Sequence, residues 1–147
     1  PDPDKVVIYG MSVGGMPAGE MASTYDACAQ VYEAAYNSIS AKVETNTALS
    51  MPGSFFTSGL VENDLKLADS TIPALFLHGD QEDRIHMDEA ERLYKAIPDD
   101  TPKQFIVVEG AGHGLGGDFG GVPEQGIGAY ESYLRDFFDN HAPGCIE

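Results

Sequence analysis

The sequence predicts an α/β domain built on a mostly parallel sheet with flanking helices, and three observations support this fold class. Short apolar runs alternate along the chain with amphipathic stretches, which is the pattern of βαβ units. Glycine-bearing loops with reactive side chains follow three of the apolar runs, as at the carboxyl edge of open α/β sheets. The length of 147 residues and the hydrophobic share of 42% fit one globular domain with a single core. We therefore expect a single domain over residues 1–147.

Strands and helices alternate along the whole chain in the predicted order of elements. In chain order we expect a strand at 5–9, a helix at 16–36, a strand at 43–51, a short helix at 61–69, a strand at 72–79, a helix at 87–97, a strand at 103–110, a glycine-rich loop at 110–121 and a helix at 124–141. The run KVVIY is apolar enough for a buried strand. Small and apolar residues at helical spacing predict one helix over 16–36, because Pro17 falls in its first turn. The strand at 43–51 rests on the weakest pattern, since its alternation is polar and MPGS ends it.

The second half of the chain has clearer periodicity. The apolar run IPALFLHG predicts a strand, and its proline lies near the start, where a missing donor does little harm. Met87, Leu93 and Ile97 lie at helical spacing, and PDD then stops that helix. KQFIVVEG is a further buried strand, and the closing helix is amphipathic.

Charge excludes two classes of partner. The chain has 24 acidic and eight basic residues and a formal net charge of −16, which repels nucleic-acid backbones and anionic membranes. No stretch approaches the ~20 consecutive apolar residues of a membrane span. Such acidity slightly favours a secreted protein. Cys28 and Cys145 lack metal-ligand spacing, and they form either one long-range disulfide, which suits an oxidising compartment, or two separate buried thiols.

A lone serine stands in the turn after the first strand. Gly10-Met11-Ser12-Val13-Gly14 matches the G-x-S-x-G pattern of a nucleophile elbow between a strand and a helix. In such a turn the hydroxyl is exposed, and the main-chain N–H of Val13 is a natural oxyanion donor at the helix start. The alternative is an ordinary glycine-rich turn with no chemical role.

An acidic loop and a histidine loop follow later strands. The first, LFLHGDQEDRI, holds Glu82 and Asp83, and the second, VVEGAGHG, places His113 between glycines. A histidine in such a loop is by itself more often structural than catalytic. The order serine, acid, histidine after successive strands is, however, the order of a catalytic triad.

Together these motifs resemble the C-terminal half of an α/β-hydrolase, from the nucleophile strand to the last helix. IYGMSVGG, PALFLHGDQEDRIHMDEAERLYKAI and VVEGAGHG match family blocks in the expected order and cover nearly all of the chain. The resemblance implies a serine hydrolase acting on a small-molecule ester. Ser12 would attack a carbonyl, His113 would carry the proton, and water would hydrolyse the acyl-enzyme. Peptidase and acyltransferase variants share this centre.

The triad acid is Glu82 or Asp83. The resemblance favours Glu82, because ungapped alignment puts it three residues after the glycine of HG, and QEDRI is similar to DDRV of prolyl-oligopeptidase-like members. Ile85 and Ala90 then also fall at the family's apolar and small positions. Asp83 has the usual residue type but needs a one-residue bulge. Both acids therefore stay open at this point.

The resemblance also implies N-terminal strands that this chain does not contain. In the family, a loop after one of those strands supplies the second oxyanion amide, and without them the strand at 5–9 is an unprotected edge. We expect an N-terminal segment, a second chain or a homo-oligomer to complete the sheet. The rival interpretation is a non-catalytic binding or assembly module that keeps the fold and lacks a working oxyanion hole.

The remaining histidines and loop aromatics carry weaker signals. His78 has the position of a packing residue, and His86 and His141 have no neighbours in sequence that would complete a metal site, so we expect neither metal nor cofactor. Aromatic side chains in loops would suit an apolar acyl or aryl group, or would simply anchor those loops. They are Phe55, Phe56 and Phe119.

Overall fold

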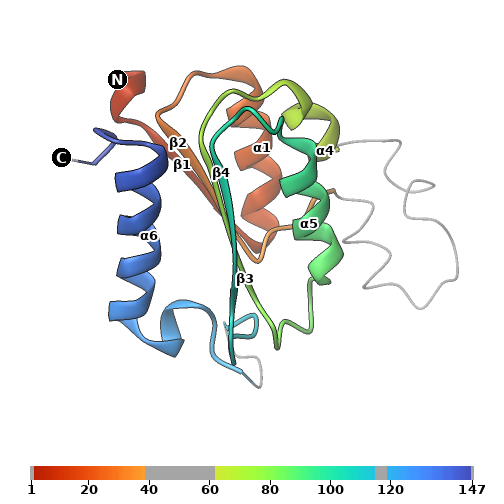
Figure 1. Cartoon of the computed structure of the whole chain (residues 1–147). Helices are drawn as coiled ribbons and strands as arrows, with labels where there is room; N and C mark the ends of the chain where they lie inside the picture. Colours follow the sequence, from red (N-terminus) through yellow and green to blue (C-terminus); the bar gives the residue numbers. More distant parts are fainter. Residues whose placement is uncertain (1, 39–61, 115–118, 147) are drawn as a thin grey trace, which may run out of the picture.

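The computed structural model describes residues 2–38, 62–114 and 119–146 (Figure 1). These residues form a four-stranded parallel sheet in the order β1-β2-β3-β4. The strands are β1 (Val7–Met11), β2 (Ala29–Glu33), β3 (Ala74–Gly79) and β4 (Lys103–Val108). The predicted α/β class with a parallel sheet is confirmed. β1, β3 and β4 also confirm the strands expected at 5–9, 72–79 and 103–110.

Helices cover both faces of the sheet. The α-helices are α1 (Gly15–Thr24), α4 (Asn63–Lys66), α5 (Met87–Ala96) and α6 (Ile127–His141), and the 3₁₀ turns are η1 (Pro3–Lys5), η2 (Ser12–Gly14), η3 (Leu67–Asp69) and η4 (Pro123–Gln125). Figure 1 shows α6 alone on one face and α1, α4 and α5 on the other. The helices predicted at 61–69, 87–97 and 124–141 are therefore present, with slightly different ends.

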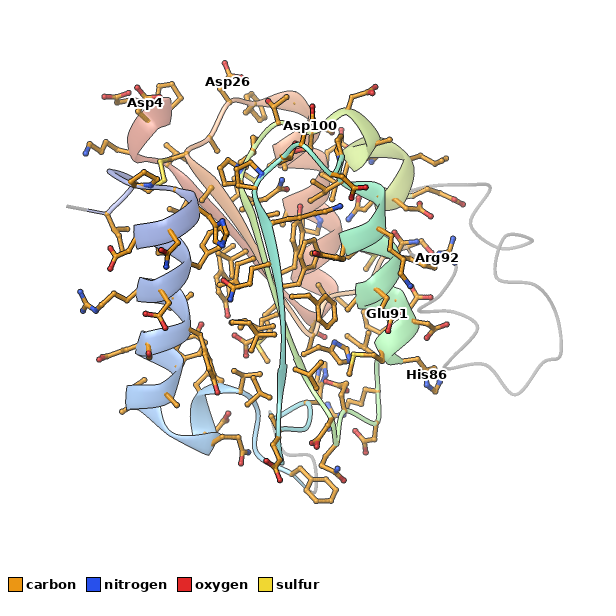
Figure 2. All side chains as sticks on the ribbon, in the orientation of Figure 1. Asp4, Asp26, His86, Glu91, Arg92 and Asp100 are labelled. Atoms are coloured by element: carbon orange, nitrogen blue, oxygen red, sulfur yellow. A yellow bond between two sulfur atoms is a disulfide. The ribbon has the colours of Figure 1, made fainter. Side chains whose placement is uncertain are left out.

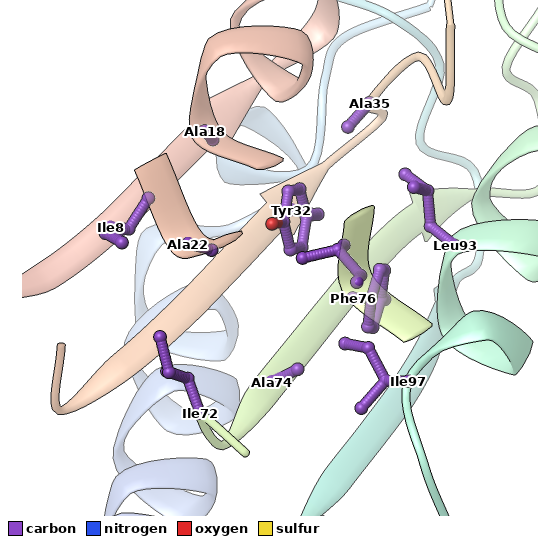
Figure 3. Close-up of a cluster of buried hydrophobic side chains, with 11 residues drawn as sticks. Ile8, Ala18, Ala22, Tyr32, Ala35, Ile72, Ala74, Phe76, Leu93 and Ile97 are labelled. Carbon is purple, nitrogen blue, oxygen red and sulfur yellow. The ribbon is translucent and has the colours of Figure 1, made fainter. Parts of the chain in front are cut away.

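A hydrophobic core lies on each face, because the inner strands bury alternate side chains on opposite sides. Tyr32 and Phe76 face α1 and α5, where their rings stack with centroids 5.1 Å apart (Figure 3). Val31 and Leu75 face α6 and pack near Phe137. Within the described residues, no helix is long and apolar enough to cross a membrane.

The prediction of one helix over 16–36 is wrong. α1 ends at Thr24, the backbone becomes extended at Tyr25, and residues 29–33 form β2. β2 lies between β1 and β3 and all five of its residues are buried, so pairing on both sides overrides the helix propensity of an alanine-rich stretch. The strand expected at 43–51 lies outside the described residues.

The two cysteines form a disulfide. Cys28 and Cys145 have Cα atoms 5.6 Å apart and are separated by 117 residues. The bond joins the segment just before β2 to the segment after α6. It therefore fixes the last helix to the middle of the sheet.

Candidate active site

The loops after β1, β3 and β4 meet at one edge of the sheet. All four strands are parallel, so their carboxyl ends lie on the same side, at the bottom of Figure 1. The register aligns Met11 with Glu33, and Glu33 with Leu77, across neighbouring strands. Open α/β sheets place their ligand sites at this edge.

Ser12 occupies a strained turn between β1 and α1. Its φ of 54° lies in the left-handed region, which a non-glycine residue rarely adopts. Gly10 makes the close approach of strand and helix possible, because a Cβ there would lie 2.6 Å from Cβ of Ala18. Ser12 is partly exposed, and Val13 is 50% exposed at the start of the helix. The strand, the strained serine and the helix thus follow one another directly at this edge of the sheet.

His113 is paired with Glu82. Nδ1 of His113 lies 2.8 Å from Oε2 of Glu82, and the two side chains are only 4% and 1% exposed. The other carboxylate oxygen, Oε1, accepts main-chain hydrogen bonds from Arg84 at 2.8 Å and from Ile85 at 3.1 Å. Both oxygens of Glu82 are therefore used, which fixes the carboxylate and leaves Nε2 of the imidazole for chemistry.

Within the described residues, Asp83 and Asp80 make no hydrogen bond or ion pair with the imidazole. Asp83 is exposed and makes no hydrogen bond or ion pair within the described part of the chain. Oδ1 of Asp80 accepts the main-chain N–H of Gly110 at 2.7 Å, and the N–H of Gln81 donates to the carbonyl of Ala111 at 2.9 Å. These bonds hold the acidic loop against the histidine loop.

His78 packs beneath the acidic loop. The ring is fully buried at the end of β3, and Nε2 lies 3.1 Å from the carbonyl oxygen of Ile85. Burial lowers the pKa of His78, so the ring is held in its neutral form. This environment is that of a packing residue.

Glu33 is a buried acid that the sequence analysis missed. It ends β2 and is 1% exposed, and its Oε2 accepts hydrogen bonds from the hydroxyls of Tyr9 and Tyr130. Its Oε1 has no partner within the described residues. Burial raises the pKa of Glu33, while the two tyrosines and His113 favour its carboxylate form and Glu124 opposes it. The signal that would have revealed it, a buried acid at a strand end, was hidden by the helix assigned to 16–36.

The end of β2 lies beside the serine turn. Met11, the residue before Ser12, pairs with Glu33 in the sheet. Within the described residues, however, the hydroxyl of Ser12 makes no hydrogen bond to the imidazole. Hydrogen bonds between catalytic residues are often long before substrate binds, so the missing bond is compatible with a catalytic pairing of Ser12 and His113.

The remaining histidines and loop aromatics are dispersed. His86 is exposed at the start of α5 and points outward in Figure 2, and His141 ends α6. Phe119 is 47% exposed, and Phe55 and Phe56 lie outside the described residues. No group of three His, Cys, Asp or Glu side chains suited to a metal ion occurs in residues 2–38, 62–114 and 119–146.

Comparison with known proteins identifies the fold. The chain is 27% identical over 111 residues to human alpha/beta hydrolase domain-containing protein 17B, a match that spans 76% of this chain and 36% of the relative. An acylaminoacyl peptidase structure matches 96% of this chain and 24% of its own, with a TM-score of 0.70 and 16% identity. The chain has an α/β-hydrolase fold.

A monoacylglycerol lipase from Paleococcus ferrophilus shows the same fold on a smaller protein. It matches 92% of this chain and 68% of its own, with a TM-score of 0.62 and 16% identity. The chain thus spans about a third of the length of the curated relatives it matches and about two thirds of this lipase. No family model matches the chain.

Proposed function

We propose that the chain carries the catalytic centre of a serine hydrolase that acts on carboxylic esters. The observation that carries this proposal is the buried pair of Glu82 and His113 at the sheet edge where Ser12 occupies a positive-φ elbow. A buried carboxylate that orients an imidazole, with a partly exposed serine at the same sheet edge, is the arrangement that activates a weak nucleophile.

Each residue has one role in the proposed reaction. Oγ of Ser12 attacks the ester carbonyl carbon while Nε2 of His113 takes the hydroxyl proton, and the N–H of Val13 donates to the oxyanion that forms. The protonated imidazole then gives its proton to the leaving alcohol as the C–O bond breaks. Water, deprotonated in turn by His113, hydrolyses the acyl-enzyme. Glu82 accepts from Nδ1–H throughout and keeps the imidazole oriented.

Esters are the favoured substrates because of the chemistry of the leaving group. Similar structures include a monoacylglycerol lipase and an esterase domain, but also peptidases. An alkoxide is a better leaving group than an amide anion, and a peptide bond is also stabilised by resonance, so an ester needs less transition-state stabilisation from the site. Peptidase and acyltransferase activities are variants of the same proposal.

We also propose that further strands pair with β1. Its outer edge has no partner strand within the described residues, and Tyr9 and Met21 beside it are each 46% exposed. An N-terminal segment, a second chain or a second copy would cover this edge and supply a second oxyanion donor. One such donor contributes roughly 2.7 to 4 kcal/mol to transition-state stabilisation. The mass of the native assembly tests this part of the proposal.

Labelling with a fluorophosphonate probe tests the catalytic proposal. We expect one probe per chain on Ser12, no labelling of Ser12→Ala, and loss of p-nitrophenyl ester hydrolysis in that variant. A folded sample, verified by circular dichroism, that takes up no probe would refute the proposal. That outcome would favour the rival function, a binding or assembly module, for which the lack of a Ser12–His113 hydrogen bond is the supporting observation.

A further inference from the structure

The chain immediately after β2 adopts an unusual backbone conformation. Within the described residues, Ser12 and Ala34 are the two non-glycine residues with positive φ, and that of Ala34 is 40°. β2 ends at Glu33, although the N–H of Ala34 still donates to the carbonyl oxygen of Leu77 in the neighbouring strand at 2.9 Å. Strained non-glycine residues persist only where their surroundings determine them. The conformation of Ala34 therefore indicates that the next residues are held in a required position.

Those next residues pack against the serine elbow. The main-chain N–H of Tyr36 donates to the carbonyl oxygen of Ser12 at 3.2 Å. Ala35 lies so close to Gly15 that a Cβ on Gly15 would be 2.5 Å from Cβ of Ala35. The segment 34–36 thus supports the strained turn from beneath, at the residue that carries the proposed nucleophile.

The side chain of Tyr36 reaches a second loop of the site. The ring is 1% exposed, and its hydroxyl donates to the carbonyl oxygen of Arg84 at 3.0 Å. The N–H groups of Arg84 and Ile85 donate to Oε1 of Glu82. The hydroxyl of Tyr36 therefore holds the same short stretch of backbone that orients the Glu82 carboxylate.

We propose that Tyr36 is a positioning residue that sets the placement of Ser12 relative to Glu82 and, through Glu82, to His113. One residue contacts the elbow with its main chain and the acidic loop with its side chain. This inference rests on the proposed hydrolase function, because it assigns Tyr36 a part in that site. Displacing a reacting group by about 1 Å can lower a rate about 100-fold, so one lost hydrogen bond at this joint has a measurable effect.

Tyr36→Phe tests the side-chain contact, and Tyr32→Phe is a matched control. Both tyrosines are 1% exposed, and both hydroxyls donate a hydrogen bond. The hydroxyl of Tyr32, which lies in the core cluster of Figure 3, donates to Oε1 of Gln30 at 2.8 Å. Both changes remove one hydroxyl and keep the ring and the main chain. We expect Tyr36→Phe to lower kcat and the fluorophosphonate labelling rate by about 5- to 100-fold, with KM unchanged. Tyr32→Phe should change both by less than about two-fold at a similar fall in Tm.

Amide hydrogen exchange separates failure of this inference from failure of the proposed function. In Tyr36→Phe, and not in Tyr32→Phe, the amides of residues 84 and 85 should exchange faster, since their loop loses an anchor. If the wild-type protein takes up the probe but both variants match it in rate, the positioning role is wrong and the hydrolase stands. If the wild-type protein takes up no probe, the hydrolase proposal fails, and with it the catalytic role of Tyr36, even where exchange shows that the contact exists.

Discussion

Replacing Glu82 with glutamine would test the centre of the proposed site with almost no change in shape. The carboxylate uses Oε2 for Nδ1 of His113 and Oε1 for the N–H groups of Arg84 and Ile85. In Glu82→Gln, the amide oxygen must stay toward those two main-chain donors, because an NH₂ group there would face two other donors. The side-chain NH₂ is then turned toward Nδ1 of His113.

This orientation forces the wrong tautomer of the imidazole. With a donor opposite it, Nδ1 must accept, so the ring proton resides on Nε2 and the ring can no longer take the proton of Ser12. In serine protease triads, replacing the triad carboxylate with its amide lowers kcat about 10⁴-fold for the same reason. We expect a loss of about 10⁴-fold in kcat/KM, which corresponds to about 5.4 kcal/mol of transition-state stabilisation.

The assay is kcat/KM for p-nitrophenyl butyrate, with the rate of fluorophosphonate labelling as a second measure. Asp83→Asn is the matched control, because it neutralises the neighbouring acid, which is exposed and makes no hydrogen bond or ion pair with the imidazole. We expect that variant to stay within about three-fold of the wild type. A loss below about 10-fold in Glu82→Gln, or an equal loss in Asp83→Asn, would refute the assignment of Glu82.

Three further predictions concern the scaffold. Replacing Cys28 and Cys145 with serine should lower the free energy of unfolding by about 5 kcal/mol, because the disulfide closes a loop of 117 residues and so restricts the unfolded chain. A loss below about 1 kcal/mol in calorimetry would contradict this prediction. Gly10→Ala should abolish probe labelling of Ser12 and lower the free energy of unfolding by about 1 to 3 kcal/mol, because the new Cβ would lie 2.7 Å from the carbonyl oxygen of Gly14. A fully labelled variant would show that the turn can relax around this Cβ and would contradict the prediction. Burial raises the pKa of Glu33 in the folded state, so the folded protein binds this proton more tightly than the unfolded chain does and loses stability as pH rises from about 4.5 through the folded pKa. Glu33→Gln lacks this titration, so the Tm of the variant minus the Tm of the wild type should increase over that pH range. A Tm difference that does not change with pH would contradict the raised pKa.

Strong periodicity and loop motifs were enough to predict most of the fold and the three loops of the site. The apolar runs that became β1, β3 and β4 and the amphipathic stretches that became α5 and α6 each carry a full pattern of their own. The choice between Glu82 and Asp83 could not be made from the residues alone. It depends on main-chain donors at Arg84 and Ile85, which exist only once the loop has folded against the histidine loop.

The one misassigned segment lies at the centre of the sheet, and its chemistry explains the error. Gln30 is fully buried in β2, and its amide donates to Oγ of Ser70 and to the carbonyl of Ile72, both at 2.9 Å. Its Oε1 accepts from the hydroxyl of Tyr32 at 2.8 Å. Because the buried polar side chains of β2 are hydrogen-bonded in the core, the strand can be buried without an apolar run or an alternation of apolar and polar residues. The pattern of AQVYEAAY alone is therefore typical of a helix.

The contacts made at the end of β2 could not be predicted from the sequence either, because no simple pattern marks this strand. A central strand is paired on both sides, so the residues at its end are held by two neighbouring strands at once. Glu33 is aligned with Met11 on one side and Leu77 on the other, and Ala34 then directs the chain toward Ser12 and Arg84. The serine elbow and the acidic loop come from strands that do not pair with each other. Their relative placement is therefore set through the end of β2, which is where a variant that changes the reaction without contacting substrate should be sought.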